Sequence, residues 1–255
     1  MSHASLDRLE HRPWALPGAP WVWRQSWLDL LFAHWPLEAR VLQRFVPLPL
    51  RVQEFEGTSW IGLVPFRMAG VMRRPLPDLP WISAFPELNV RLYVEHQGKP
   101  GVWFLSLDAT NPLAVWAARR FFHLPYYNAR IQCRGSGDAI HYSARRKGLE
   151  PQLEASYRPT SEPYESTPGT LEHWLTERYC LYAQAPDGTI WRNEVHHAPW
   201  PLQAAEATLS KNTYFSPHGL SVAGPPATLH FARRIDVIVW DATRVAWPAV
   251  AEDVH

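Results

Sequence analysis

Lysine is scarce in this chain. Of the 25 Lys and Arg residues, only Lys99, Lys147 and Lys211 are lysines. Schiff-base catalysis needs a free amine, and a lysine at its ordinary pKa of about 10.4 is almost fully protonated near neutral pH. The sequence places these lysines in a hairpin turn (QGKPG), a loop (RRKG) and an irregular polar segment (LSKNT). None is therefore expected to be a desolvated, reactive amine.

Cysteine is scarce too, and long apolar runs are missing. Cys133 and Cys180 lie in separate predicted strands without C-x-x-C spacing, which favours two buried free thiols. The first residues show no apolar signal-peptide core, and no uncharged run reaches the ~18 residues of a membrane span. The net charge is +1 and there is no long basic run. We therefore expect a cytoplasmic protein that binds neither membrane nor nucleic acid.

Motifs for nucleophilic, phosphate-binding, dinucleotide-binding and metal chemistry are also missing. There is no G-x-S-x-G, P-loop, G-x-G-x-x-G or H-E-x-x-H pattern. Adjacent residues of a strand face opposite ways, so His196 and His197 cannot both bind one metal. Glu194 shares the face of His196. We expect no metal and no cofactor, and His196 either makes a structural hydrogen bond or donates one in a pocket.

Tryptophan and proline are abundant, with 14 and 25 residues. Many short strands punctuated by proline, around an aromatic-rich interior, would account for both. The patterns predict hairpins over 51–56 and 58–68 about Gly57, over 89–96 and 102–109, and over 129–135 and 139–146. They also predict strands over 27–37, 178–184, 190–197 and 228–240, a proline-rich loop over 73–88, and helices over 36–45, 110–122 and 169–179. Pro36 begins the first helix, and Thr110 or Asn111 caps the second.

These elements indicate an α+β fold in a single domain, built on a strongly bent, mostly antiparallel sheet with a few flanking helices. Closure into a cone or barrel is favoured because it removes exposed sheet edges. The boundaries that we expect are a Pro/Trp-rich arm over 1–26, the domain over 27–245 and a tail over 246–255.

The segment FPELNVRLYVEH holds the main candidate site. In a strand, Glu87, Asn89, Arg91 and Tyr93 share one face, and leucines and valines occupy the other. The polar face is either a solvated outer surface or, in a closed sheet, the lining of the interior. An interior lining of carboxylate, amide and guanidinium would suit a small ligand with a carboxylate or a carbonyl.

Several motifs together resemble a known family. They are VLQRFVPLPL, WIGLVPFRM, FPELNVRLYV, LPY, LTERYCLY and EVHHAPWPLQ. They resemble the uncharacterised bacterial YqjF-like family over roughly residues 27–240. That family is placed in the acetoacetate decarboxylase-like superfamily. The resemblance implies a bent antiparallel sheet that closes around a pocket, in agreement with the strand pattern.

The same resemblance assigns candidate site residues. The decarboxylases carry a G-x-P-K-K-like stretch, where the first lysine forms the Schiff base. The corresponding stretch here is HLPYY, residues 123–127, with Tyr126 and Tyr127 in place of both lysines. A phenol cannot form an imine, but it can donate a hydrogen bond to a carbonyl or stack on a ligand. Glu87 falls at the superfamily's pocket glutamate, and His34 aligns nearest to its pocket arginine. The candidates for holding a ligand anion are Arg91, Arg178 and Arg67.

Three functions stay open from the sequence. The first is an enzyme without covalent catalysis, with Glu87 as general acid or base and Tyr126 polarising a carbonyl. The second is a ligand-binding or sensing protein that has lost the catalytic amine. The third is a structural role. In the first two the partner is a small molecule, and an open edge strand would also allow a homo-oligomer.

Overall fold

The computed structural model describes residues 3–76 and 83–246. Most of them lie in one 13-stranded sheet. The strands are β1 (Trp23–Leu37), β2 (Arg51–Val52), β3 (Ser59–Arg73), β4 (Phe85–His96), β5 (Lys99–Ala109), β6 (Tyr126–Ser136), β7 (Ala139–Arg146), β8 (Gln152–Pro159), β9 (Cys180–Gln184), β10 (Ile190–His197), β11 (Gln203–Asn212), β12 (Thr228–Val239) and β13 (Thr243–Ala246). The helices are α1 (Ala39–Leu42), α2 (Pro112–Phe122) and α3 (Leu171–Thr176), with 3-10 turns η1 (Ala4–Asp7), η2 (Gln43–Phe45) and η3 (Ser216–His218).

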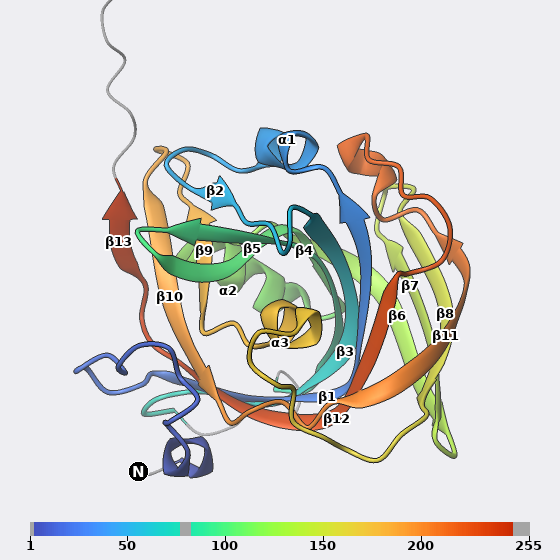
Figure 1. The fold of residues 1–255 in the computed structure, drawn as a ribbon, viewed down its shortest axis with the longest axis horizontal. Helices are drawn as coiled ribbons and strands as arrows, with labels where there is room; N and C mark the ends of the chain where they lie inside the picture. Colours follow the sequence, from blue (N-terminus) through green and yellow to red (C-terminus); the bar gives the residue numbers. More distant parts are fainter. Residues whose placement is uncertain (1–2, 77–82, 247–255) are drawn as a thin grey trace, which may run out of the picture.

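The sheet closes on itself. Hydrogen-bonded neighbours run β5–β9–β10–β12–β1–β3–β4 and back to β5, which makes a ring. The ring is antiparallel except where β5 pairs with β9. A shift of register within β1, between Leu28 and Ala33, lets this long strand bend, and Asp29 takes a left-handed φ of 51° there. The closed, strongly curved sheet predicted from the sequence is confirmed (Figure 1).

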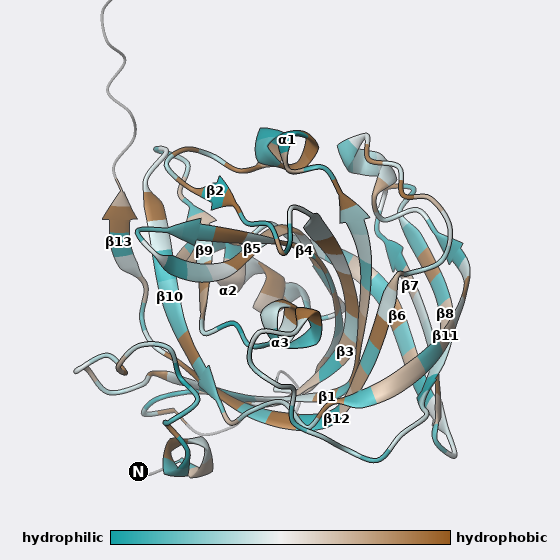
Figure 2. Ribbon diagram, in the orientation of Figure 1, coloured by the Kyte–Doolittle hydropathy of each residue, from teal (hydrophilic) through white to brown (hydrophobic). Residues whose placement is uncertain are grey.

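A second layer covers one side of the ring. β6, β7, β8 and β11 leave the ring at β5, through a parallel pairing with β6, and rejoin it at β12. Their inward side chains pack on the outer face of β1, β3 and β4. The shared core holds Leu88, Val90, Leu92 and Val94 of β4. Apolar and polar residues alternate along these strands (Figure 2), as expected where each face meets a different environment.

The interior of the ring has its own apolar core and a helix at one end. Phe32, Phe66, Tyr126 and Trp200 belong to this second core. In Figure 1, α3 lies within the ring. Its buried Leu175 packs beside Tyr93 of β4. The inward face of β4 is therefore buried from Glu87 to Tyr93.

Helix α2 begins and ends as predicted. The Asn111 side chain accepts hydrogen bonds from the backbone N–H groups of Leu113 and Ala114, and Pro112 occupies the first turn. The helix ends at His123, whose φ of 54° turns the chain to the left-handed region. This exit leads the chain directly into β6. The tyrosine pair therefore stands at the first residues of a strand that borders the ring.

Four local predictions were wrong. Pro36 does not begin a helix; it lies in β1, and α1 starts only at residue 39. The turn at Gly57 exists, but β2 pairs with β4 instead of β3. Lys211 lies in β11 rather than in an irregular segment, and Lys99 begins β5 rather than projecting from a solvated turn. Strands β8, β11 and β13 were not predicted, although more and less buried residues alternate along β8 and β11.

The ends of the chain are described in part. Residues 3–22 run outside the sheet, and the indole N–H of Trp240 donates to the carbonyl of Ala19, which fastens this arm to the ring. Most of the predicted tail, 247–255, and residues 77–82 of the predicted loop lie outside the described residues. Cys133 is half-buried and Cys180 is buried, both as free thiols. Within the described residues, no helix is long and apolar enough to cross a membrane.

Candidate functional site

The polar face of β4 points into the ring. Glu87, Asn89 and Arg91 stand opposite Phe66, Val64 and Gly62 of β3. All three polar residues are at least nine-tenths buried. Because Leu88 and Val90 fill the core on the other side of the strand, the alternation predicted from the sequence is confirmed. The polar face is therefore interior, and the alternative of a solvated outer surface is excluded.

Glu87 is a buried carboxyl group held by a phenol. Its side chain is 1% exposed, and the hydroxyl of Tyr126 donates a hydrogen bond of 2.8 Å to Oε2. Burial raises the pKa of Glu87 to about 8; the Tyr126 hydrogen bond lowers it, and the nearby charge of Asp108 raises it. Most Glu87 side chains therefore carry a proton at neutral pH. A protonated carboxyl group can both donate and accept hydrogen bonds.

Tyr126 connects Glu87 to a surface hollow. The chain leaves α2 at His123, passes Pro125 and enters β6, which directs the Tyr126 ring inward. A hollow of about 260 Å³ lies on the outer side of this turn. It is lined by Arg119, His123, Leu124, Pro125, Tyr126, Tyr127, Gln184 and Pro186. The Arg119 Nε–H also donates to the carbonyl of Tyr126. Tyr126 thus forms the wall between the hollow and the buried carboxyl group.

A second polar group lies further along the same face of β4. Arg91 Nε–H donates to the Tyr93 hydroxyl at 3.0 Å, and that hydroxyl lies 2.6 Å from Nε2 of His34. Burial, and then the charge of Arg91, lowers the pKa of His34 well below its usual value, so its ring is neutral. Because Tyr93 accepts from Arg91, it is free to donate to His34. Gly62 makes room here, since a Cβ would lie 3.0 Å from the His34 ring.

Arg91 and Arg178 both contact the end of α3. Arg91 Nη2 donates to the carbonyl of Leu175 at 3.0 Å, and Arg178 Nε donates to that of Trp174 at 2.7 Å. Arg178 lies over the Tyr93 ring, 5.0 Å from its centroid. Burial lowers the pKa of Arg178 to about 10. Among the described residues, neither guanidinium has a carboxylate within ion-pair distance, and Asn89 Oδ1 and Arg178 Nη2 are buried without a hydrogen-bond partner.

The remaining predicted residues lie elsewhere. Tyr127 faces away from Glu87 and packs under the Arg146 guanidinium, 3.8 Å from its ring centroid, although it also lines the hollow. His196 hydrogen-bonds to the carbonyl of Ser5 in the N-terminal arm at 2.7 Å, and burial lowers its pKa to about 4. Arg67 pairs with Asp29. The structure therefore brings together Glu87 with Tyr126, and Arg91 with His34 and Arg178, along the Asn89 face.

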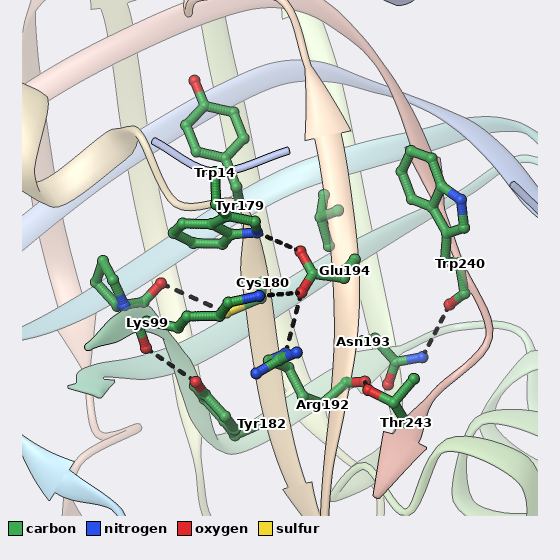
Figure 3. Close-up of polar contacts among 12 residues, drawn as sticks. Trp14, Lys99, Tyr179, Cys180, Tyr182, Arg192, Asn193, Glu194, Trp240 and Thr243 are labelled. Atoms are coloured by element: carbon green, nitrogen blue, oxygen red, sulfur yellow. Dashed lines mark hydrogen bonds and ion pairs between the residues drawn. The ribbon is translucent and has the colours of Figure 1, made fainter. Parts of the chain in front are cut away.

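No lysine reaches the interior. Lys147 and Lys211 are exposed. Lys99 is half-buried, with Nζ 3.6 Å from Oε1 of Glu194 and 5.2 Å from the Trp14 ring centroid. Figure 3 shows Lys99 and Glu194 beside Arg192. The ring interior thus offers no amine for an imine, as the sequence suggested. In the part of the chain that is described, no three His, Cys, Asp or Glu side chains form a group that could hold a metal.

Sequence reasoning missed two buried ion pairs. Asp108 and Arg146 lie between the ring and the second layer, joined at 2.7 Å and almost fully buried. Glu194 accepts from Arg12 and Trp14 of the N-terminal arm, both at 2.7 Å. The sequence gives little indication of these ion pairs, because each partner lies in an ordinary alternating strand or in an irregular segment. Only the pairing of distant segments brings them together.

Comparison with solved structures places the fold in a known class. The chain is similar to the enduracididine biosynthesis enzyme MppR complexed with pyruvate, with a TM-score of 0.63, 11% identity, and 89% of this chain and 91% of that chain covered. It is equally similar to acetoacetate decarboxylase from Legionella pneumophila, with a TM-score of 0.63, 12% identity and 93% and 92% coverage. At these identities the likeness shows the fold alone, which is that of the acetoacetate decarboxylase-like proteins.

Sequence comparison gives the family. The model of the DUF2071 family, described as an uncharacterised conserved protein, matches residues 24–236. The uncharacterised protein YqjF of Bacillus subtilis is 42% identical over 235 residues, which is 92% of this chain and 97% of that protein. The chain therefore belongs to this YqjF-like family, as its motifs indicated.

Proposed function

We propose that this protein binds a small carboxylate that also carries a carbonyl group, and that Glu87 exchanges a proton with it without a covalent intermediate. The observation that carries the proposal is the Glu87–Tyr126 pair. A carboxyl group with a pKa raised to about 8 lies next to the wall of an open hollow. A general acid or base works best when its pKa lies near the working pH. Perturbed carboxyl groups of this kind gather at functional sites.

The charge balance of the interior favours an anionic ligand. Arg91 and Arg178 are buried and have no carboxylate partner among the described residues. Glu87 is largely neutral at pH 7 and so does not compensate them. An unpaired buried cation is costly, and a ligand carboxylate would remove that cost through charge-assisted hydrogen bonds. The unpartnered Asn89 Oδ1 belongs to the residue between Glu87 and Arg91 on the inward face of β4, and it would accept a hydrogen bond from a ligand hydroxyl.

The proposed chemistry is proton transfer at the carbonyl group. Tyr126 holds Oε2 of Glu87, which leaves the other carboxyl oxygen available to the ligand. Neutral Glu87 gives its proton to the carbonyl oxygen while a solvent water removes a proton from the adjacent carbon, which yields the enol. When the carbonyl re-forms, the Glu87 carboxylate takes the hydroxyl proton back and the carbon takes a proton from solvent. No atom of the protein bonds to the ligand. This agrees with the absence of a lysine in the interior.

The structural neighbours support the ligand class. One of them, MppR, was solved with pyruvate, which has a carboxylate and an adjacent carbonyl. Pyruvate is small enough to enter a hollow of about 260 Å³. We therefore choose pyruvate and acetoacetate as probes, with methyl pyruvate as the matched neutral control.

The test separates binding from proton transfer. Thermal shift measures binding, and proton NMR in D2O measures exchange of the pyruvate methyl hydrogens. We expect pyruvate to stabilise the wild type, methyl pyruvate to have little effect, and the methyl hydrogens to exchange faster than without protein. Glu87→Gln should keep the thermal shift and lose the exchange, whereas Arg91→Ala should lose both. Arg134→Ala, on the outer face of β6, should behave like the wild type.

Binding without catalysis is the second candidate. The lack of an interior lysine favours it, because the amine chemistry of the decarboxylases is missing. A thermal shift with no exchange in the wild type would support it over proton transfer. No thermal shift with any of the probes would refute the proposed ligand class. In either case borohydride with pyruvate should leave the mass of the protein unchanged, and an added mass at any lysine would overturn the non-covalent mechanism.

A further inference from the structure

A second hollow lies away from the ring interior, on the outer face of the second layer. Its volume is about 480 Å³. It is lined by Thr110, Ala129, Arg130, Ile131, Gln132, Ser143, Ala144, Arg145, Lys147 and Glu154. These residues come from the adjacent strands β6, β7 and β8, together with Thr110 after β5 and Lys147 after β7. The proposed ligand site does not involve this face.

The hollow is rich in cations that lack partners. Arg130, Arg145 and Lys147 are exposed, and none of them forms an ion pair with another described residue. Glu154 is the one acidic residue of the lining, so three positive charges meet one negative charge and leave a net +2. Glu154 lies beyond ion-pair distance of all three cations. The lining therefore has unused positive charge.

The placement of two of these cations is unfavourable without a ligand. Arg130 of β6 lies directly opposite Arg145 of β7. Like charges directly opposite one another in adjacent strands destabilise the pair. Elsewhere in the same layer Arg158 of β8 contacts an acid, Glu206 of β11. The arginine pair thus stands out within its own sheet, and an anion bound between the two guanidinium groups would remove the repulsion.

We propose that this hollow binds a phosphate group. A phosphate group carries more than one negative charge near neutral pH and matches the net +2, whereas a single carboxylate does not. Two guanidinium groups can each give parallel N–H donors to its oxygens, and Lys147 adds a point charge. The hydroxyl groups of Thr110 and Ser143 are further donors in the lining. The phosphate group belongs either to a soluble phosphate compound or to a lipid headgroup.

The test uses pyrophosphate and vesicles on the full chain. Isothermal titration with pyrophosphate at low salt should show binding, which weakens as salt is raised because the contacts are solvent-exposed. Arg130→Ala and Arg145→Ala should each weaken it about tenfold, the loss expected for a hydrogen-bonded charge contact. Arg158→Ala is the matched control on the same layer and should leave the affinity unchanged. All three side chains are exposed, and a thermal melt of each variant checks that the fold is kept.

The remaining measurements identify the source of the phosphate. Flotation with phosphatidic acid vesicles, compared with phosphatidylcholine vesicles, tests a lipid headgroup. Binding to these vesicles that depends on Arg130 and Arg145, without binding of pyrophosphate, would assign the site to a lipid. Binding of pyrophosphate alone would assign it to a soluble compound. If neither binds, or if Arg158→Ala weakens binding as much as Arg145→Ala does, the proposal is wrong.

Discussion

Replacing Glu87 by glutamine should make the folded protein more stable at neutral pH. The folded protein keeps the Glu87 proton up to about pH 8, whereas an unperturbed carboxyl group loses it near the reference value of 4.5. Between these two values the folded state binds more protons than the unfolded state does. Its stability therefore falls as the pH rises through this window. Glutamine does not titrate and still offers an oxygen to the Tyr126 hydroxyl.

The size of the effect follows from the same shift. Each pH unit between the two pKa values changes the unfolding free energy by about 1.4 kcal/mol. At pH 7, which is 2.5 units above the reference value of 4.5, Glu87→Gln should add about 3 kcal/mol to the unfolding free energy. The gain should vanish below pH 4.5 and level off above pH 8, where Glu87 is ionised in both states.

Urea denaturation followed by tryptophan fluorescence, from pH 4 to pH 9, measures this difference. Glu154→Gln is the control, because its side chain is exposed and should give nearly the wild-type curve at every pH. A gain that does not change with pH would mean that Glu87 does not titrate in this range. A loss of stability at pH 7 would mean that Glu87 is ionised and stabilised by its surroundings, and the proposed general acid would then be refuted.

Three further changes test the packing. Gly101→Ala should cost about 1–3 kcal/mol of stability, because a Cβ there would lie 2.7 Å from the sulfur and 2.9 Å from the carbonyl oxygen of Cys180 in β9. Gly135→Ala is the control: the nearest atom to its Cβ would be 3.9 Å away, so it should cost much less in the same urea titration. Arg146→Ala should cost about 3–5 kcal/mol by leaving Asp108 buried and unpaired, and pairing it with Asp108→Asn should recover part of that loss. His196 has a pKa lowered to about 4 from 6.5, so stability should fall as the pH drops through that range, and His196→Gln should remove up to about 3 kcal/mol of the fall, measured as unfolding free energy at pH 7 and pH 4.

The sequence predicted the closed sheet because its strongest signals were hairpins. β4 and β5 are long, alternate regularly and join through a short turn, so their pairing is local. Helix α2 has both a capping asparagine and a proline in its first turn. The two-residue strand β2 pairs with β4 instead of β3. Such a short pairing is set by the tertiary structure and not by the local sequence. Pro36 resembled a helix start, but it lies in β1, where it is paired with Trp60 of β3.

The candidate site was predictable only where it lies on one regular strand. The inward face of β4 followed from strand periodicity once the sheet was expected to close. The family resemblance identified Tyr126 as a site residue. Its contact with Glu87 depends on the position of β6, which follows α2 in the chain. The network of Arg91, Tyr93 and His34 joins strands that are far apart in sequence, so no local sequence pattern predicts it. Of the two roles that the sequence left open for His196, the structure shows the structural hydrogen bond, made to the carbonyl of Ser5 in the N-terminal arm.

The arginines proposed to hold the ligand also contact α3. Arg91 donates one N–H to the α3 carbonyl of Leu175 and another to Tyr93, so its guanidinium already has a fixed direction. Arg178 holds the neighbouring carbonyl of Trp174. Fixed donors bind an anion with little ordering cost, because their own rotamers are set beforehand. Apolar side chains in these places would make the interior more stable than a buried neutral acid and two cations without a carboxylate partner do. Such a costly arrangement is expected where a site has to receive a ligand, rather than where a core has only to be filled.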